Sequence, residues 1–483
     1  MKYKKQPIFL ILNCKLLFFR TIFSNFSIAT ISRLLIGGIS LIIVAMLTRH
    51  LGPDGYGDYN TIFAYIFLFV TGADLGLYTV LTREISRPGA DEEKIIGNIF
   101  TIRLGAILLG AVVANIIAVF LPYSGLVKLG IFIGTIFMVL SSLGQVLMGI
   151  FQKRLRVYLV SAADLIARIV QLFLIFLLIF LKAPFLFFIG VVVISEVIHF
   201  VSIFMFALKL VKIRVLFDLD YWKEVFKIAL PIAASLVFVL IYFKIDTFLL
   251  SIMKQPYDVG VYSVAYKILE FVIFFPAIYL GLVMPVLSKY AISNKDKFKE
   301  LFKKIFNNLS VFGLPLAAII FTAPDQIAVV LGGSQFLESG SVLQILSIAV
   351  LLIFFGNLGG HALVALNLQK KGMWIYMLGM VINLMGNIIY IPKYSFVAAA
   401  WTTVITEIIV TITMFYIIKK HIKLVPDFDI LLKSLFASLI IGSLIYILNP
   451  SNIFFVGLIS LIYLPAIYLF GGIKKEDFVS LVG

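Results

Sequence analysis

The sequence predicts an all-α integral membrane protein, with about fourteen transmembrane helices arranged as two parallel six-helix bundles plus two C-terminal helices. Composition is the first observation. Hydrophobic residues make up 62% of the 483 positions and charged residues only 13%, whereas soluble domains carry about 25% charged residues. The second observation is that apolar runs of about 20 residues, the length that crosses a bilayer, recur throughout the chain. The third is a motif that occurs once in each half.

The first six apolar runs define a predicted N-terminal bundle, residues 1–208. They lie at residues 26–48, 59–81, 95–121, 128–151, 158–181 and 184–208. A basic connection follows at residues 209–227 and cannot bury a core of its own. We interpret this connection as a cytoplasmic linker between the two bundles.

Eight further runs follow the linker, at residues 228–253, 260–287, 305–330, 340–368, 373–392, 396–418, 430–448 and 452–472. The first six of these define a predicted C-terminal bundle, residues 228–418, and residues 419–483 hold the last two helices and a cytoplasmic tail. An even number of crossings returns the chain to its starting side. The second bundle therefore enters the membrane in the same orientation as the first, which is the arrangement of parallel repeats.

Basic residues fix the predicted orientation. Most of the 40 lysines and arginines lie in alternate connections, the distribution that marks cytoplasmic loops. We predict a multi-pass protein of the cell (plasma) membrane with both termini in the cytoplasm. The formal net charge of +16 follows from this topology, so nucleic-acid binding is not predicted. Lysines concentrated at residues 289–304 are expected to contact anionic lipids.

The repeated motif supports the two-bundle architecture. Residues 51–60 read LGPDGYGDYN, and residues 254–267 read KQPYDVGVYSVAYK. One common shift places Pro53 on Pro256 and Gly57 on Gly260, and also aligns a tyrosine. Proline and glycine at these positions predict a short turn that ends the preceding helix. Both copies follow the first predicted helix of their bundle.

Charged residues inside the predicted spans are the candidate functional residues. Each costs about 2.5–3.5 kcal/mol at a helix centre, so it is expected to face protein or water rather than lipid. A cation in a cleft between two bundles could bind a phosphate group. The predicted substrate-binding residues are Arg33, Lys244, Lys267 and Arg103. Two alternatives remain: Arg33 could extend to lipid head groups, and Lys244 could belong to a structural ion pair.

Acidic residues in the spans could serve either structural ion pairs or a coupling proton or cation. Three acid–base pairs have a spacing of three or four residues, which places both members on one helix face. These pairs are Asp164–Arg168, Glu196–His199 and Lys267–Glu270. Neutralisation within each helix is the favoured interpretation, and a proton or ion relay is the alternative.

Two other acids have no partner on their own helix. Asp74 and Arg103 are expected to meet each other or another helix of the first bundle. Asp246 points away from Lys244 around the helix, so it should pair with another helix or serve a coupling ion, H⁺ or Na⁺. Asn383 and Asn387, which have glycines nearby, predict helix packing and interhelical hydrogen bonds.

Several kinds of chemistry have no signature in the sequence. There is one cysteine, and the four histidines lack metal-ligand spacing, so no metal site is predicted. No phosphate-binding Walker loop, Ser–His–Asp arrangement or HExxH motif occurs. We therefore predict no cofactor and no enzymatic activity.

The turn after the first helix, LTRHLGPDGYGDYN, resembles that of the polysaccharide-biosynthesis flippases in the multidrug/oligosaccharidyl-lipid/polysaccharide (MOP) exporter superfamily. DVGVYSVAYK at residues 258–267, GLPL at 313–316 and GGSQF at 332–336 are similar to later motifs of that family. The resemblance covers essentially the whole chain. It implies a fold like that of the MOP and MATE transporters, with a hydrated and often cationic cleft between two bundles.

The resemblance also implies a function, which is to move an isoprenoid-diphosphate-linked oligosaccharide from the cytoplasmic to the outer leaflet by alternating access. The first alternative is a cation-coupled multidrug exporter of the same fold, which would need acids such as Asp74 or Glu270 in the cleft. The second is a polytopic enzyme that transfers glycans. The lack of a paired acidic cluster in an outer loop argues against this last hypothesis.

Overall fold

The computed structural model describes residues 8–450 and 452–472, and within these ranges the ordered elements are helices. The side chains of residues 8–30, 231, 232, 234–236 and 240 are outside the description. Ten helices of the described part are long and apolar enough to cross a membrane. The predicted all-α membrane fold is therefore confirmed, while the count of about fourteen spans stays a prediction. The end of the predicted cytoplasmic tail, from residue 473, lies outside the described residues.

The chain forms two compact units. The first takes residues up to Ile43 and Ile66–Leu236, and the second takes Val44–Tyr65 and the residues from Val237 onward. A short segment of the first half, Val44–Tyr65, thus packs with the second half of the chain. The predicted domain limits at residues 208, 227 and 418 stay a prediction.

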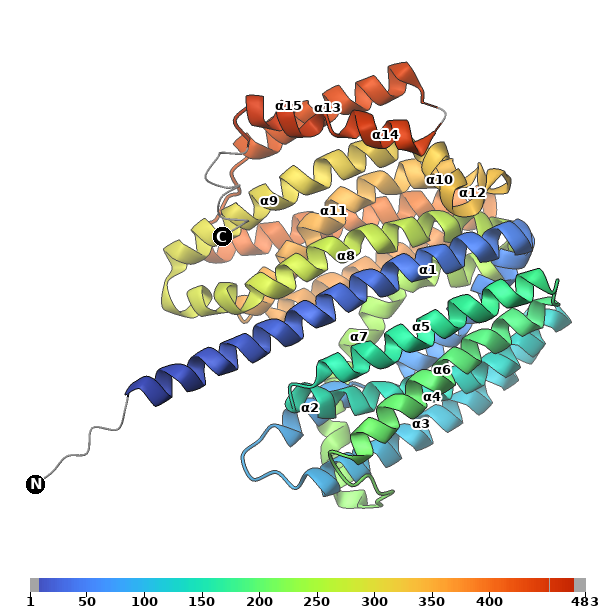
Figure 1. The fold of residues 1–483 in the computed structure, drawn as a ribbon, viewed down its shortest axis with the longest axis vertical. Coiled ribbons are helices and arrows are strands. Elements are labelled where there is room, and N and C mark those ends of the chain that lie inside the picture. Colours follow the sequence, from blue (N-terminus) through green and yellow to red (C-terminus); the bar gives the residue numbers. More distant parts are fainter. Residues whose placement is uncertain (1–7, 451, 473–483) are drawn as a thin grey trace, which may run out of the picture. The chain divides into compact units, whose positions relative to one another are not determined.

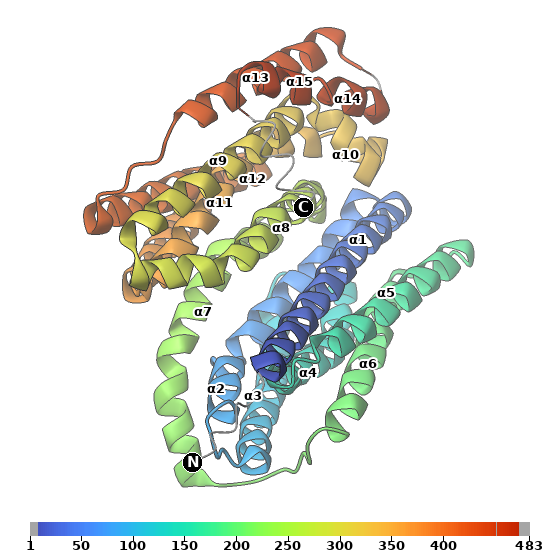
Figure 2. The ribbon, with the colours of Figure 1, turned by 60° about the vertical axis from the view of Figure 1, so that its left-hand side comes forward.

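The first unit is built from long helices that follow one another along the chain. Part of α1 (Ile8–Gly72) is followed by α2 (Leu77–Ile85), α3 (Glu92–Phe120), α4 (Gly125–Lys153), α5 (Val157–Phe180) and α6 (Phe185–Leu208). Polar caps fix two of their starts, because the Asp91 and Ser124 side chains accept hydrogen bonds from the first turns of α3 and α4. Helix α4 packs against α3 and α6 (Figure 2).

The linker of residues 209–218 is bound along one face of α3. The Thr101 hydroxyl accepts a hydrogen bond from Leu216 N at 3.1 Å, and the side-chain oxygen Asn98 Oδ1 accepts one from Asp218 N at 3.0 Å. Lys94 Nζ lies 2.8 Å from Asp218 Oδ2, and this bond holds the pKa of Asp218 below its ordinary value. The Asp218 carboxylate also accepts from Tyr221 N and so caps the first turn of α7 (Leu219–Met253).

The second unit is centred on α11. It contains the later part of α7, then α8 (Pro256–Ser293), α9 (Lys295–Thr322), α10 (Pro324–Gly332), the 3₁₀ helix η1 (Ser334–Phe336), α11 (Ser339–Ala365) and α12 (Gln369–Ile422). Helix α11 packs against α8, α9 and α12, and Figure 1 shows it beside α8 and α9 (Figure 1). Its apolar side chains are buried on several sides.

Two long helices contain a single residue whose backbone is not helical. Gly52 in α1 has φ of 67°, a conformation that glycine adopts without strain. Ser395 in α12 has φ of 49°, and it falls between the predicted spans 373–392 and 396–418. The predicted turn at residues 51–60 is corrected here, because the break is confined to Gly52 and residues 53–60 are helical. Pro53 starts the new helix, where its missing N–H costs nothing.

The two copies of the repeated motif pack against each other in the second unit. A Cβ added to Gly57 would overlap the carbonyl oxygen of Pro256 and lie 2.5 Å from its carbonyl carbon. A Cβ added to Gly260 would overlap the carbonyl oxygen of Pro53 and lie 3.0 Å from its carbonyl carbon. The contact is reciprocal, as at a two-fold axis, and only glycine allows the backbones to approach this closely. Nearby, Arg49 Nη2 donates to the Val330 carbonyl at 2.7 Å and ties α1 to α10.

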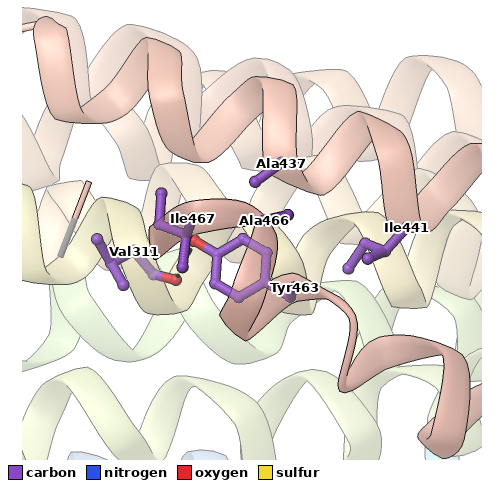
Figure 3. Close-up of a cluster of buried hydrophobic side chains, with 6 residues drawn as sticks. All are labelled: Val311, Ala437, Ile441, Tyr463, Ala466 and Ile467. Atoms are coloured by element: carbon purple, nitrogen blue, oxygen red, sulfur yellow. Dashed lines mark hydrogen bonds between the residues drawn. The ribbon is translucent and has the colours of Figure 1, made fainter. Parts of the chain in front are cut away.

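The C-terminal helices α13 (Asp429–Leu448), α14 (Ile453–Ser460) and α15 (Tyr463–Leu469) complete the second unit. Figure 3 shows Tyr463, Ala466 and Ile467 of α15 beside Ala437 and Ile441 of α13 and Val311 of α9 (Figure 3). The Tyr463 hydroxyl donates to the Val311 carbonyl at 2.8 Å. The predicted last span, residues 452–472, is therefore divided into two short helices.

Candidate functional site

Two lysines and one glutamate form a charged group between α7 and α8, which we call the lysine–glutamate triad: Lys244, Lys267 and Glu270. Lys244 Nζ donates to Glu270 Oε1, and Lys267 Nζ lies 2.9 Å from Glu270 Oε2. The Lys244 ammonium also lies 5.1 Å from the centre of the Tyr266 ring, within the range of a cation–π interaction. The triad carries one more positive than negative charge.

The triad is accessible at the surface of its unit. The side chains of Lys244, Glu270 and Lys267 are 34%, 28% and 39% exposed. Charged groups within membrane-spanning helices are costly next to lipid, so this exposure favours contact with water or a polar ligand. The predicted pair Lys267–Glu270 forms, and Lys244 joins it from the neighbouring helix.

Asp246 lies in a separate polar cluster. The residue is only 2% exposed, and its carboxylate accepts hydrogen bonds from the Tyr262 hydroxyl at 2.9 Å, from Asn387 Nδ2 at 2.6 Å and from the Thr403 hydroxyl at 2.8 Å. Asn387 Nδ2 also donates to Asn383 Oδ1 at 3.0 Å. The cluster therefore joins α7, α8 and both parts of α12 through one buried acid.

The partners of Asp246 are neutral groups. Among the described residues, no lysine, arginine or histidine forms an ion pair with it. Asn387 Oδ1 is also buried, and it has no hydrogen-bond partner among the residues that the structure describes. A buried carboxylate whose hydrogen-bond partners are all neutral can take up a proton, and its oxygens together with Asn387 Oδ1 are hard ligands for a small cation.

A small cavity adjoins the Asp246 cluster and contains a second acid. The cavity offers a volume of about 10 Å³ to the centre of a water molecule. It can therefore hold roughly one water. Asp246 and Glu407 both line it, together with Tyr242, Asn383 and Thr403. Glu407 is 4% exposed and accepts a hydrogen bond from the Tyr242 hydroxyl.

In the first unit, Arg103 and Asp74 form a sealed ion pair. Arg103 Nη1 lies 2.8 Å from Asp74 Oδ1, and the arginine side chain is 0% exposed. The guanidinium also donates to Gln145 Oε1 at 3.0 Å and to the Ser142 carbonyl at 3.3 Å. The expectation that Asp74 and Arg103 meet within the first bundle is confirmed. A role of Arg103 in substrate binding stays a prediction, which its burial does not favour.

The remaining predicted residues also lie in the first unit. Arg33 is exposed and close enough to Tyr78 to interact with it electrostatically. Arg168 Nε lies 3.5 Å from Asp164 Oδ1, and His199 Nδ1 lies 3.4 Å from Glu196 Oε1. Their parts in substrate binding or coupling stay predictions.

Sequence reasoning did not find several members of the Asp246 cluster and its cavity. Tyr262 is the tyrosine that the common shift of the repeated motif aligns, and Thr403 and Tyr242 carry no signal of their own. Glu407 is visible in the sequence only as an acid inside the predicted span 396–418. A hydroxyl or amide side chain on a helix next to a buried acid cannot be recognised as its hydrogen-bond partner until the packing of the helices is known.

Comparison with known proteins shows the family to which the chain belongs. The family model described as polysaccharide biosynthesis protein matches residues 22–291, more than half of the chain. The chain belongs to this polysaccharide biosynthesis protein family. A second family model, MatE, matches residues 231–389. The resemblance inferred from the sequence motifs is confirmed.

Individual proteins are similar to this chain in sequence or in structure. The chain is 24% identical over 405 residues to the capsular polysaccharide biosynthesis protein CapF of Staphylococcus aureus, covering 82% of this chain and 99% of that protein. The structure is similar to that of the lipid II flippase MurJ in an inward closed conformation. The TM-score is 0.77 at 17% identity, over 93% of this chain and 99% of that one. An inward-facing multidrug resistance MATE transporter of the MOP superfamily gives a TM-score of 0.61 at 15% identity, covering 80% of this chain and 94% of that one. The protein is therefore a multi-pass membrane protein with a MOP-type fold.

Proposed function

We propose that this protein is a flippase that moves an isoprenoid-diphosphate-linked oligosaccharide from the cytoplasmic to the outer leaflet, by alternating access, for the assembly of a surface polysaccharide. The observation that carries this proposal is the lysine–glutamate triad. It is an exposed, net-positive group on α7 and α8 of a polysaccharide biosynthesis family member. A diphosphate crossing the membrane needs such cations in a low-dielectric setting.

Several further properties belong to this proposal. The protein acts in the cell membrane with both termini in the cytoplasm, and it transports its substrate without chemical change and without a cofactor. Lys244 and Lys267 bind the diphosphate, and Arg33 is a separate candidate cation of the first unit. Lysines between residues 289 and 304 contact anionic lipids. The isoprenoid tail stays in the bilayer while the glycan crosses.

Neutralising the triad tests the proposed substrate site. Lys244→Gln and Lys267→Gln should each lower glycan export about tenfold or more, because each removes a charge-assisted contact to phosphate. The measurement is surface polysaccharide, together with lipid-linked sugar on the inner leaflet, in a deletion strain that carries each variant at equal protein level. Lys433→Gln removes a lysine whose pair with Asp429 is exposed, and it should leave export unchanged. Normal export by the double variant would remove the assignment.

Asp246 is the proposed site of the coupling ion, H⁺ or Na⁺. Its neutral surroundings and the unpartnered oxygen of Asn387 fit a cation that enters and leaves. If Na⁺ binds there, Na⁺ added in place of an equal concentration of choline should raise the melting temperature of the purified protein. If H⁺ binds there, lowering the pH should have that effect. Asp246→Asn should abolish whichever response the wild type shows. The same response in both proteins would exclude Asp246 as the coupling site.

A cation-coupled multidrug exporter is the second candidate, favoured by the MatE match over residues 231–389 and by the buried Asp246 within that range. It differs from the flippase in one measurable respect. Deletion of an exporter should increase drug sensitivity while surface glycan stays normal, whereas deletion of a flippase should remove the glycan and trap its lipid-linked precursor on the inner leaflet.

A further inference from the structure

We propose that Glu270 is a built-in substitute for the substrate's phosphate: it occupies the two lysines while the site is empty, and the diphosphate displaces it. This inference rests on the proposed flippase function and adds how the site exchanges anions. It concerns an acid that the sequence assigns only to a structural or coupling pair. In this view Glu270 regulates substrate affinity without contacting the substrate in the loaded state.

The geometry of the triad supports exchange. The two carboxylate oxygens of Glu270 are divided between the lysines, with Oε1 accepting from Lys244 and Oε2 from Lys267. A phosphate group likewise offers neighbouring oxygens to two ammonium groups. The lysines come from different helices, so one bridging anion holds them together across α7 and α8. The Tyr266 ring, 5.1 Å from Lys244 Nζ, positions that ammonium whichever anion is bound.

The contrast with the sealed pair in the first unit shows why the triad can open. Arg103 is 0% exposed and has two further acceptors besides Asp74. Glu270 is 28% exposed, and the hydrogen bonds described for its carboxylate come from the two lysines alone. A ligand with more negative charge can therefore reach both lysines and displace Glu270 without breaking any other described bond.

Displacement of Glu270 by the substrate, and its later return to the lysines, would assist both the loading and the release steps of the transport cycle. Two unpaired ammonium groups in membrane helices would be costly, so Glu270 stabilises the empty carrier. After the substrate reaches the outer side, the carboxylate competes for the lysines and speeds release. Removing its charge should therefore make binding tighter and release slower.

Binding of farnesyl diphosphate to the full-length protein in lipid nanodiscs tests this exchange, with farnesol as the probe that lacks phosphate. Glu270→Gln should bind farnesyl diphosphate about tenfold more tightly than wild type, because an internal competitor of charge-assisted strength is removed. Glu270→Asp keeps the charge on a shorter side chain and should give an intermediate affinity. Asp429→Asn, which alters the exposed pair with Lys433, should leave the affinity unchanged. Farnesol binding should be equal in all proteins.

Equal or weaker farnesyl diphosphate binding in both Glu270 variants would overturn the inference and make Glu270 a structural brace. The Glu270→Asp variant keeps the test decisive if the glutamine variant does not fold. Absence of farnesyl diphosphate binding in wild type and variants alike would also overturn it. The flippase function is judged separately, by whether deletion of the gene traps lipid-linked sugar on the inner leaflet.

Discussion

Replacement of Arg103 by methionine is expected to destabilise the protein by about 3–5 kcal/mol, the cost of leaving one member of a buried ion pair without its partner. Asp74, 8% exposed as a residue, would lose the guanidinium donor that lies 2.8 Å from its Oδ1. Gln145 and the Ser142 carbonyl would lose donors as well. The expected result is a much lower yield of folded protein and a lower unfolding temperature in detergent.

Two comparisons make this prediction specific. Arg154→Met removes an ion pair of the same length, 2.8 Å to Glu92, but that arginine is 42% exposed and Lys153 remains on the same acid. It should cost less than about 1 kcal/mol. The double variant Arg103→Met with Asp74→Leu should recover part of the loss, since no buried charge is left unpaired.

Export measurements on the Arg103→Met protein would separate a structural role of Arg103 from a role in substrate binding. An Arg103→Met protein of wild-type stability that fails to export glycan would favour the substrate-binding role that the sequence suggests for Arg103. Stability loss alone, with export proportional to the folded protein present, would make Arg103 structural. Membrane position by itself cannot separate these roles, because both require a cation that avoids lipid.

Most of the long helices could be located from the sequence because the bilayer sets their length and leaves apolar runs, but the predicted spans 59–81, 305–330 and 452–472 each contain a break between two helices. The pairing of Asp74 with Arg103 is one of the two outcomes that the sequence predicts, because two charges without local partners in one bundle are stabilised by each other, whereas the other outcome is contact with a different helix of that bundle. Lys267 and Glu270 are three residues apart on one helix, so their pairing needed no knowledge of tertiary structure.

Contacts between helices far apart in sequence could not be predicted in the same way. Asp246 accepts from Thr403 and Asn387, and this depends on how α7, α8 and α12 are rotated about their axes. Lipid-facing and core-facing positions are both apolar here, so the sequence carries little information about rotation. Asn387 could be predicted as a packing residue with interhelical hydrogen bonds, but its place beside the buried acid could not.

The repeated motif shows how a local signal can be correctly noticed and incompletely interpreted. Proline and glycine at matching positions of the two halves predict two similar turns. In the structure the glycines serve a different purpose, because Gly57 and Gly260 lie on helices where each faces the other motif's proline. Proline at the start of a helix and glycine four residues later form one side of a reciprocal contact. The repeat is therefore explained by packing between the copies rather than by turn chemistry alone.

Substitution of Gly57 or Gly260 by alanine is expected to separate α1 from α8 and to destabilise the protein by about 1–3 kcal/mol or more, as overpacking of a filled contact does. The added Cβ would overlap a backbone carbonyl oxygen in each case, and backbone atoms cannot turn aside as a flexible side chain can. The measurement is the thermal unfolding temperature of each purified variant.

The reciprocal geometry makes a sharper prediction for the double variant. If both alanines act by separating the same two helices, the second should add less than the first, so the combined loss should be smaller than the sum. Gly281→Ala is the matched control on α8, because a Cβ there meets no atom within 4 Å, and it should be neutral or stabilising, since alanine favours the helix. A double variant as stable as wild type would mean that the two motifs do not pack in this way. Strict additivity would mean that the two contacts are independent.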